Sequence, residues 1–145
     1  FLSKRFARDM AKCIQENYFM QFDMITYTPL SKKSLRKRDY NQAYLLAKEI
    51  SKILDIPLAD LLIKVRKTKE QKSLNSRERK TNVYGAFDLK DKDIVINKRI
   101  LLIDDVKTTG STLNECAKML NIYGAQSVWA ATLAVAVPKE KGDKK

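Results

Sequence analysis

The sequence predicts an α/β domain built on a central, largely parallel sheet with helices on both faces. Short apolar segments alternate with longer stretches whose apolar residues recur at helical intervals, which is typical of this class. One apolar segment, Ile100–Ile103, is an unbroken aliphatic run of the kind found in strands buried on both faces. The length of 145 residues suits one domain. We therefore predict a single domain over residues 1–137 and a frayed, charged tail over 138–145.

The first half of the chain predicts two helices and two strands. A helix over 2–16 follows from one apolar stripe, which comprises Leu2, Phe6, Met10, Cys13 and Ile14. A short strand over 24–27 ends before Pro29. The capping-box spacing of Asp39 and Gln42 predicts the start of a second helix, with apolar residues from Ala43 to Leu54 and an end at Pro57. Residues 61–65 form the second predicted strand.

The second half begins with a long charged segment and ends with a strand, a helix and a strand. Residues 66–82 contain Leu74 as their one apolar anchor, and loops of that length are usually functional or disordered. Short strands are expected over 84–96, around the turn at 91–93. A buried strand over 99–106 precedes a helix over 111–123, whose inward residues are Leu113, Cys116, Ala117 and Leu120 and whose end is Gly124. Residues 128–137 predict the last strand.

Composition excludes several classes of protein. Hydrophobic residues make up 44% and charged residues 32%, a balance typical of folded, water-soluble domains. No apolar run approaches the roughly 20 residues that cross a bilayer, and no signal peptide is visible, so we expect a cytoplasmic protein without membrane insertion. Cys13 and Cys116 are interpreted as reduced core residues, with a disulfide as the alternative. The absence of histidine excludes a histidine general base and most zinc sites.

The net charge of +12 is the strongest signal in the composition. One basic stretch runs from Lys32 to Arg38 and a second from Lys64 to Lys80. Such stretches are usually solvated loops, but they can also form a site for an anion, either a nucleic acid or a small polyphosphate. Composition alone leaves these alternatives open.

The segment from Ile100 to Thr112 carries the clearest chemical signal. A buried strand is followed by two carboxylates, a hydroxyl-rich loop and the start of a helix, and ligands of open α/β sheets bind beyond such strand ends. Loop amides, hydroxyls and the positive end of a helix together suit a phosphate monoester, and Gly110 lets the backbone approach it. The predicted 5-phosphate loop comprises Lys107, Thr108, Thr109, Gly110, Ser111 and Thr112.

Asp104 and Asp105 precede this loop, separated from it by Val106. Two carboxylates would repel a second phosphate, but they suit the hydroxyls of a ribose or a Mg²⁺ ion. The plainer interpretation is that the acidic pair starts a turn and that Thr109 or Ser111 caps a helix. The combination after a four-residue aliphatic strand favours a ribose 5-phosphate site.

The Ile100–Thr112 segment resembles the motif of type I phosphoribosyltransferases that binds phosphoribosyl diphosphate (PRPP). Further residues make the chain similar to the ComF competence-protein family; they are Pro29, Leu30, Ser31, Arg36, Arg38, Tyr40, Asn41, Gln42, Thr68, Gln71, Leu74, Arg79, Asn82, Gly85, Ala86 and Phe87. Asp39, where the family commonly has Gly, and Lys107, where it has an aromatic or aliphatic residue, depart from the pattern.

The resemblance implies a role for each part of the site. Asp104 and Asp105 would contact the ribose hydroxyls and a Mg²⁺ ion bound with PRPP, and Arg79 would join them in catalysis. The implied pyrophosphate-binding residues are Ser31, Lys32, Lys33, Arg36 and Arg38. The 66–82 segment would be a flap over the site, and a small hood would complete the fold.

Two hypotheses for the function follow from the resemblance. The first is an enzyme that transfers phosphoribose from PRPP to a nitrogenous base, or the reverse. The second is a module without turnover that senses PRPP or a nucleotide, or binds single-stranded DNA, among the competence proteins of DNA uptake.

Overall fold

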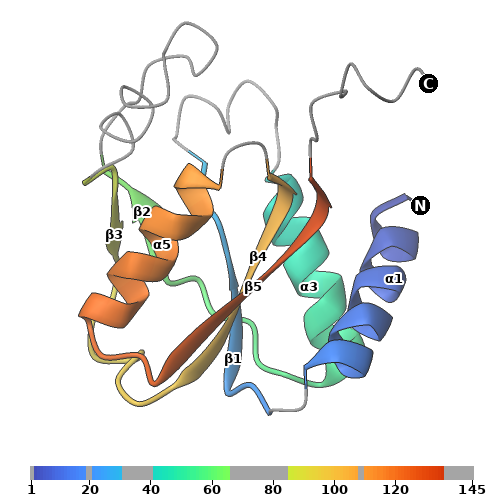
Figure 1. Cartoon of the computed structure of the whole chain (residues 1–145), viewed down its shortest axis with the longest axis horizontal. Coiled ribbons are helices and arrows are strands. Elements are labelled where there is room, and N and C mark those ends of the chain that lie inside the picture. The colour runs from blue at the N-terminus through green and yellow to red at the C-terminus, as the bar shows by residue number, and fades with distance from the viewer. Residues whose placement is uncertain (1, 19–20, 31–40, 66–84, 108–109, 136–145) are drawn as a thin grey trace, which may run out of the picture.

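The computed structural model describes residues 2–18, 21–30, 41–65, 85–107 and 110–135. Within them the chain forms three layers, with a parallel sheet between helices (Figure 1). The helices and strands, in chain order, are α1 (Leu2–Asn17), β1 (Met24–Tyr27), α3 (Gln42–Leu54), β2 (Leu62–Lys64), β3 (Phe87–Leu89), β4 (Arg99–Lys107), α5 (Ser111–Ile122) and β5 (Ser127–Val135).

The main sheet has the strand order β1-β4-β5, and all its pairs are parallel. On the other side of β1, Leu58 forms a parallel bridge with Ile25, so the sheet extends one short step further. Helices α1 and α3 cover one face and α5 covers the other (Figure 1). The predicted α/β class, with a parallel sheet flanked by helices, is confirmed.

Strand β4 lies in the middle of the sheet and divides the core into two halves. Ile100 and Leu102 pack toward α5, whereas Leu101 and Ile103 pack toward α1 and α3. All four side chains are fully buried, which confirms the strand predicted from the aliphatic run.

Strands β2 and β3 form a separate antiparallel pair that packs on the α5 side of the molecule. The pair closes with a hydrogen bond from Val65 N to the Ala86 carbonyl oxygen (2.7 Å). Residues 66–84 connect the two strands, so the predicted flap lies outside the described residues.

The predicted start of the second helix was wrong. Helix α3 begins at Gln42 and its N-cap is Asn41, whose side-chain oxygen accepts hydrogen bonds from the amides of Ala43 (3.0 Å) and Tyr44 (3.4 Å). Asn is as good a cap as Asp, and its extended backbone (φ −102°, ψ 113°) is the conformation that a cap needs.

Two further expectations differ from the structure. Cys13 is exposed, because the residues of α1 that pack are spaced i, i+3, i+4 and i+7 and are Ala7, Met10, Ala11 and Ile14. Cys116 is buried as predicted, and both cysteines are free. Over 85–96 the chain forms one strand, β3, and then a turn at 94–97 rather than several strands.

Candidate functional site

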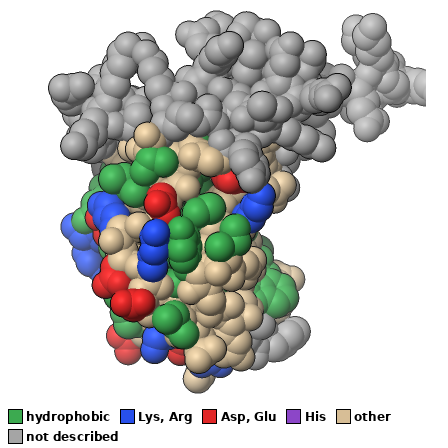
Figure 2. Space-filling view, turned by 90° about the vertical axis from the view of Figure 1, so that its left-hand side faces the viewer, with side chains coloured by type: hydrophobic (Ala, Val, Ile, Leu, Met, Phe, Trp, Pro, Cys, Tyr) green, Lys and Arg blue, Asp and Glu red, His purple; other side chains and the backbone are tan. Residues whose placement is uncertain are grey.

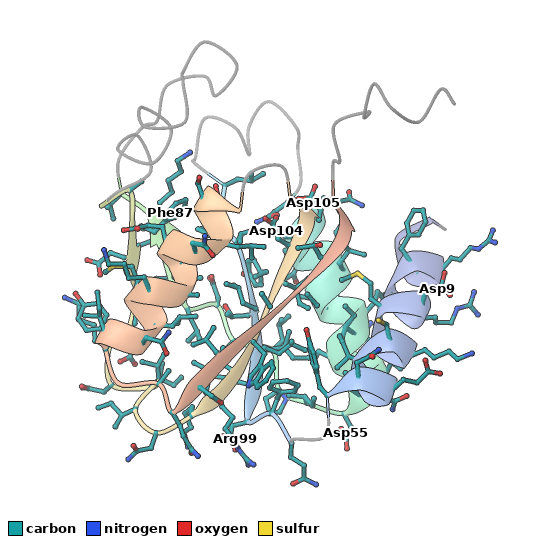
Figure 3. The ribbon with its side chains drawn as sticks, viewed as in Figure 1. Asp9, Asp55, Phe87, Arg99, Asp104 and Asp105 are labelled. Carbon is teal, nitrogen blue, oxygen red and sulfur yellow. The ribbon has the colours of Figure 1, made fainter. Side chains whose placement is uncertain are left out.

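The predicted acidic pair lies at the carboxyl end of β4. Figure 3 shows Asp104 and Asp105 next to each other there, at the end of the molecule where α3 and α5 begin. Strands β1, β4 and β5 all point toward this end because they are parallel. It is the edge at which open α/β sheets bind their ligands.

Asp104 is held in one orientation by two hydrogen bonds. Its Oδ1 accepts from the Thr28 hydroxyl at 2.8 Å and from the Asp105 amide at 2.9 Å. Thr28 is the first residue after β1. Because Tyr27 pairs with Ile103 of the neighbouring strand β4, Thr28 lies at the level of Asp104. Asp104 is only 8% exposed, whereas Asp105 is half-buried.

Burial raises the pKa of Asp104 to about 6, and the neighbouring Asp105 carboxyl adds to the increase. The hydrogen bond from Thr28 lowers the same pKa, since it favours the ionised form. A carboxylate near a strand end, with its pKa shifted by burial and by a like charge, is typical of functional sites.

Gly110 starts the helix that follows the acidic pair. Its backbone is left-handed (φ 80°, ψ −2°), a conformation that other residues rarely adopt, and it serves as the N-cap of α5. The amides in the first turn of any helix have no acceptor within the helix. Ser111 and Thr112 lie in this turn, so three members of the predicted 5-phosphate loop lie at the same end of the molecule as Asp104 and Asp105 (Figures 1 and 3). The helix N-terminus suits an anion.

The other predicted site residues cannot be placed. Lys107 ends β4, where its backbone pairs with Val135, but its side chain is not described. Those that lie outside the described residues are Ser31, Lys32, Lys33, Arg36, Arg38, Arg79, Thr108 and Thr109.

The segments that contain these basic residues begin on the side of the molecule where Asp104 lies (Figure 1). Residues 31–40 connect the end of β1 to the start of α3. The side-chain nitrogen Nδ2 of Asn41 donates to the Thr28 carbonyl oxygen at 3.0 Å, so both ends of this connection meet. The 66–84 segment returns at Gly85, whose amide donates to Glu115 Oε1 at 3.1 Å, in the second turn of α5.

Sequence reasoning missed two residues of this region, Thr28 and Glu115. Both are buried, and they bind Asp104 and Gly85, respectively. Lys64, the first residue of the second basic stretch, lies at the end of β2 near the Phe87 ring. Burial lowers the pKa of Lys64. The helical spacing contained no signal for Glu115, because a period of 3.6 residues places it away from the predicted inward stripe of Leu113, Cys116 and Leu120.

Among the described residues, no group of three or more His, Cys, Asp or Glu residues could hold a metal ion. Mg²⁺ is usually bound by one or two carboxylates together with substrate phosphates, so the Asp104–Asp105 pair fits it in that setting. Two cavities of about 370 and 390 Å³ flank α1, and no predicted site residue lines them. Within the described ranges, no helix is long and apolar enough to span a membrane.

The fold and the site together define a class of protein. The model of the phosphoribosyl transferase domain family matches residues 40–145, and the chain belongs to this family. It belongs to the ComF branch of the type I phosphoribosyltransferases, as its relatives show.

Competence protein F of Haemophilus influenzae is 41% identical over 100 residues, which cover 68% of this chain and 44% of that protein. The DNA utilization protein YhgH of Escherichia coli (strain K12) is 35% identical over 107 residues, which cover 73% of this chain and 46% of that protein. The chain thus spans less than half the length of either relative.

Solved structures show the same fold. A purine phosphoribosyltransferase from Pyrococcus horikoshii superposes with a TM-score of 0.57 at 20% identity, over 94% of this chain and 78% of that one. At this level of identity the likeness concerns the fold alone.

The raised pKa of Asp104 predicts a pH dependence of stability. Because the pKa in the folded state, about 6, exceeds the ordinary value of 3.8, the folded protein retains a proton that the unfolded chain has released between about pH 4 and 6. The free energy of unfolding should therefore fall as pH rises through this window. Asp104→Asn lacks this contribution. The free energy of unfolding of the variant minus that of the unsubstituted protein should therefore be larger at pH 7 than at pH 4, by roughly 2 kcal/mol. Urea unfolding from pH 4 to 8 measures this, and a difference that does not change with pH would contradict it.

Proposed function

We propose that this domain binds PRPP together with Mg²⁺ and transfers its phosphoribosyl group to or from a nitrogenous base. The observation that carries the proposal is the buried, oriented carboxylate of Asp104, six residues before Gly110, the N-cap of helix α5. Asp104 and Asp105 would accept hydrogen bonds from the ribose hydroxyls, and residues 107–112 would hold the 5-phosphate. Bound Mg²⁺ would supply charge neutralisation at the pyrophosphate, with the acidic pair as its protein ligands.

The remaining requirements of the reaction match the composition of the chain. Phosphoribosyl transfer passes through an oxocarbenium-like state, so it needs a held ribose and a neutralised leaving group more than an acid–base pair. Basic side chains for the pyrophosphate would come from Ser31–Arg38, and Arg79 would approach the same centre from the 66–84 segment. No step requires histidine, and the chain contains none.

Calorimetry with PRPP and Mg²⁺ tests the binding site. Asp104→Asn combined with Asp105→Asn should weaken PRPP binding at least tenfold, because each variant side chain loses a charged acceptor. The matched control is Asp91→Asn with Asp93→Asn, which removes the same charge from an exposed turn that leads to the opposite end of β4. Equal PRPP affinity in the two double variants would contradict the site.

A product assay tests transfer itself. With PRPP, Mg²⁺ and each common nucleobase in turn, the protein should release pyrophosphate faster than PRPP decays alone, and Arg79→Gln should slow the release with PRPP affinity changed little. Tight PRPP binding without release for any base would instead favour the sensing function.

A second candidate function is contact with single-stranded DNA. The stretches 31–40, 66–84 and 136–145 contain 16 of the 29 Lys and Arg residues but only 5 of the 17 Asp and Glu residues, so the rest of the chain is nearly neutral. Figure 2 shows acidic and basic side chains interspersed on the described part of one face. Two relatives are named for competence and for DNA utilization, which agrees with a nucleic-acid setting.

We expect this DNA contact to be weak and electrostatic. Single-stranded DNA should bind at low salt and be largely released near ~0.2 M, since each neutralised phosphate releases a counterion. Replacing Lys32, Arg36 and Arg38 by Gln should weaken both DNA and PRPP binding. The same replacement of Lys139, Lys141 and Lys144 should spare PRPP. Tight DNA binding at high salt that PRPP does not displace would indicate a separate nucleic-acid surface.

A further inference from the structure

Thr28 forms three hydrogen bonds that connect separate parts of the site. Its amide donates to the Ile103 carbonyl oxygen at 3.0 Å, its hydroxyl donates to Asp104 Oδ1 at 2.8 Å, and its carbonyl oxygen accepts from Asn41 at 3.0 Å. The residue is 5% exposed. It therefore joins the end of β1 to the end of β4 and to the start of α3.

The bond to Asp104 determines which carboxylate oxygen remains for a ligand. Oδ1 accepts from Thr28 and from the Asp105 amide, which uses both of its lone pairs. Oδ2 is then the oxygen left to accept from a hydroxyl. The terminal torsion of an aspartate is broad, so without the Thr28 hydroxyl the carboxylate plane is held by the Asp105 amide alone.

We propose that Thr28 is a positioning residue of the ribose site, which fixes the Asp104 carboxylate so that Oδ2 faces a ribose hydroxyl. This inference rests on the proposed PRPP-binding function. It makes Thr28 responsible for affinity toward ligands that carry the sugar hydroxyls, and not for affinity toward phosphate alone.

The same strand offers a matched control. Thr26 lies two residues earlier, is fully buried, and within the described part of the chain its hydroxyl has no hydrogen-bond partner. Thr26→Val, within β1, and Thr28→Val, directly after it, make the same chemical change two residues apart. Only the second removes a bond to Asp104.

The experiment measures two ligands against four proteins. PRPP with Mg²⁺ is titrated by calorimetry and inorganic phosphate by phosphorus NMR, on the unsubstituted chain, Thr28→Val, Thr28→Ser and Thr26→Val. Thr28→Val should weaken PRPP binding about tenfold, because it removes one hydrogen bond to a charged group. It should change phosphate binding less than about twofold. Thr28→Ser keeps the hydroxyl and should bind PRPP within about twofold of the unsubstituted chain, as should Thr26→Val.

Each result has one interpretation. PRPP affinity retained in Thr28→Val, or PRPP and phosphate affinity lost together, overturns the positioning role while PRPP binding itself stands. An unsubstituted chain that binds no PRPP overturns the proposed function and this inference with it. Thermal unfolding checks that each variant folds. If Thr28→Val does not fold, Thr28→Ala replaces it, because alanine removes the hydroxyl without putting a methyl group in its place.

Discussion

The burial of one carboxylate is the constraint on which the arrangement of the site depends. Asp104 directly follows the fully buried residues Ile100–Ile103 of β4, so its side chain is almost completely shielded from water. An ionised side chain in that position must be compensated by hydrogen bonds, and these come from Thr28 and from the next amide in its own chain. Strand β1 must therefore end at the level where β4 turns polar. The raised pKa of Asp104 shows that these hydrogen bonds offset only part of the cost of burial.

The sequence could predict those parts of the fold and of the site whose signal lies within a few neighbouring residues. The aliphatic run of β4 and the helical spacing in α3 and α5 express burial within one element, so the parallel α/β class could be predicted from them. Asp104, Asp105 and Gly110 lie within seven residues of one another, and a strand followed by a helix brings them together at one end. That part of the site follows from local structure alone.

What the sequence could not predict depends on partners far apart in the chain. Thr28 and Asp104 are separated by 76 residues, and Gly85 and Glu115 by 30. A threonine after a strand and a glutamate in a helix are ordinarily exposed, and only the packing of β1 beside β4, and of α5 beside Gly85, gives each a buried partner. The prediction of the N-cap of α3 was wrong for a related reason. Asp39 and Asn41 are both good caps by type, and the hydrogen bond from Asn41 to Thr28 fixes which of them is used.

The uneven distribution of charge completes the physical argument for the site. A nearly neutral framework presents two carboxylates at one end. Strands β1, β2 and β5 end on that same side (Figure 1), and the segments that follow them, two connections and the C-terminal tail, contain most of the net charge of +12. The ends of the first connection are held together by Thr28 and Asn41, and those of the second by Val65 and Ala86. Carboxylates alone would repel a polyphosphate, and cations alone would bind any anion without discrimination. Under the proposed function, a ligand that offers hydroxyls to the acidic pair and phosphates to these basic segments satisfies both. A DNA backbone has no free ribose hydroxyl and offers only phosphates, so the acidic pair favours the proposed PRPP site over the DNA contact.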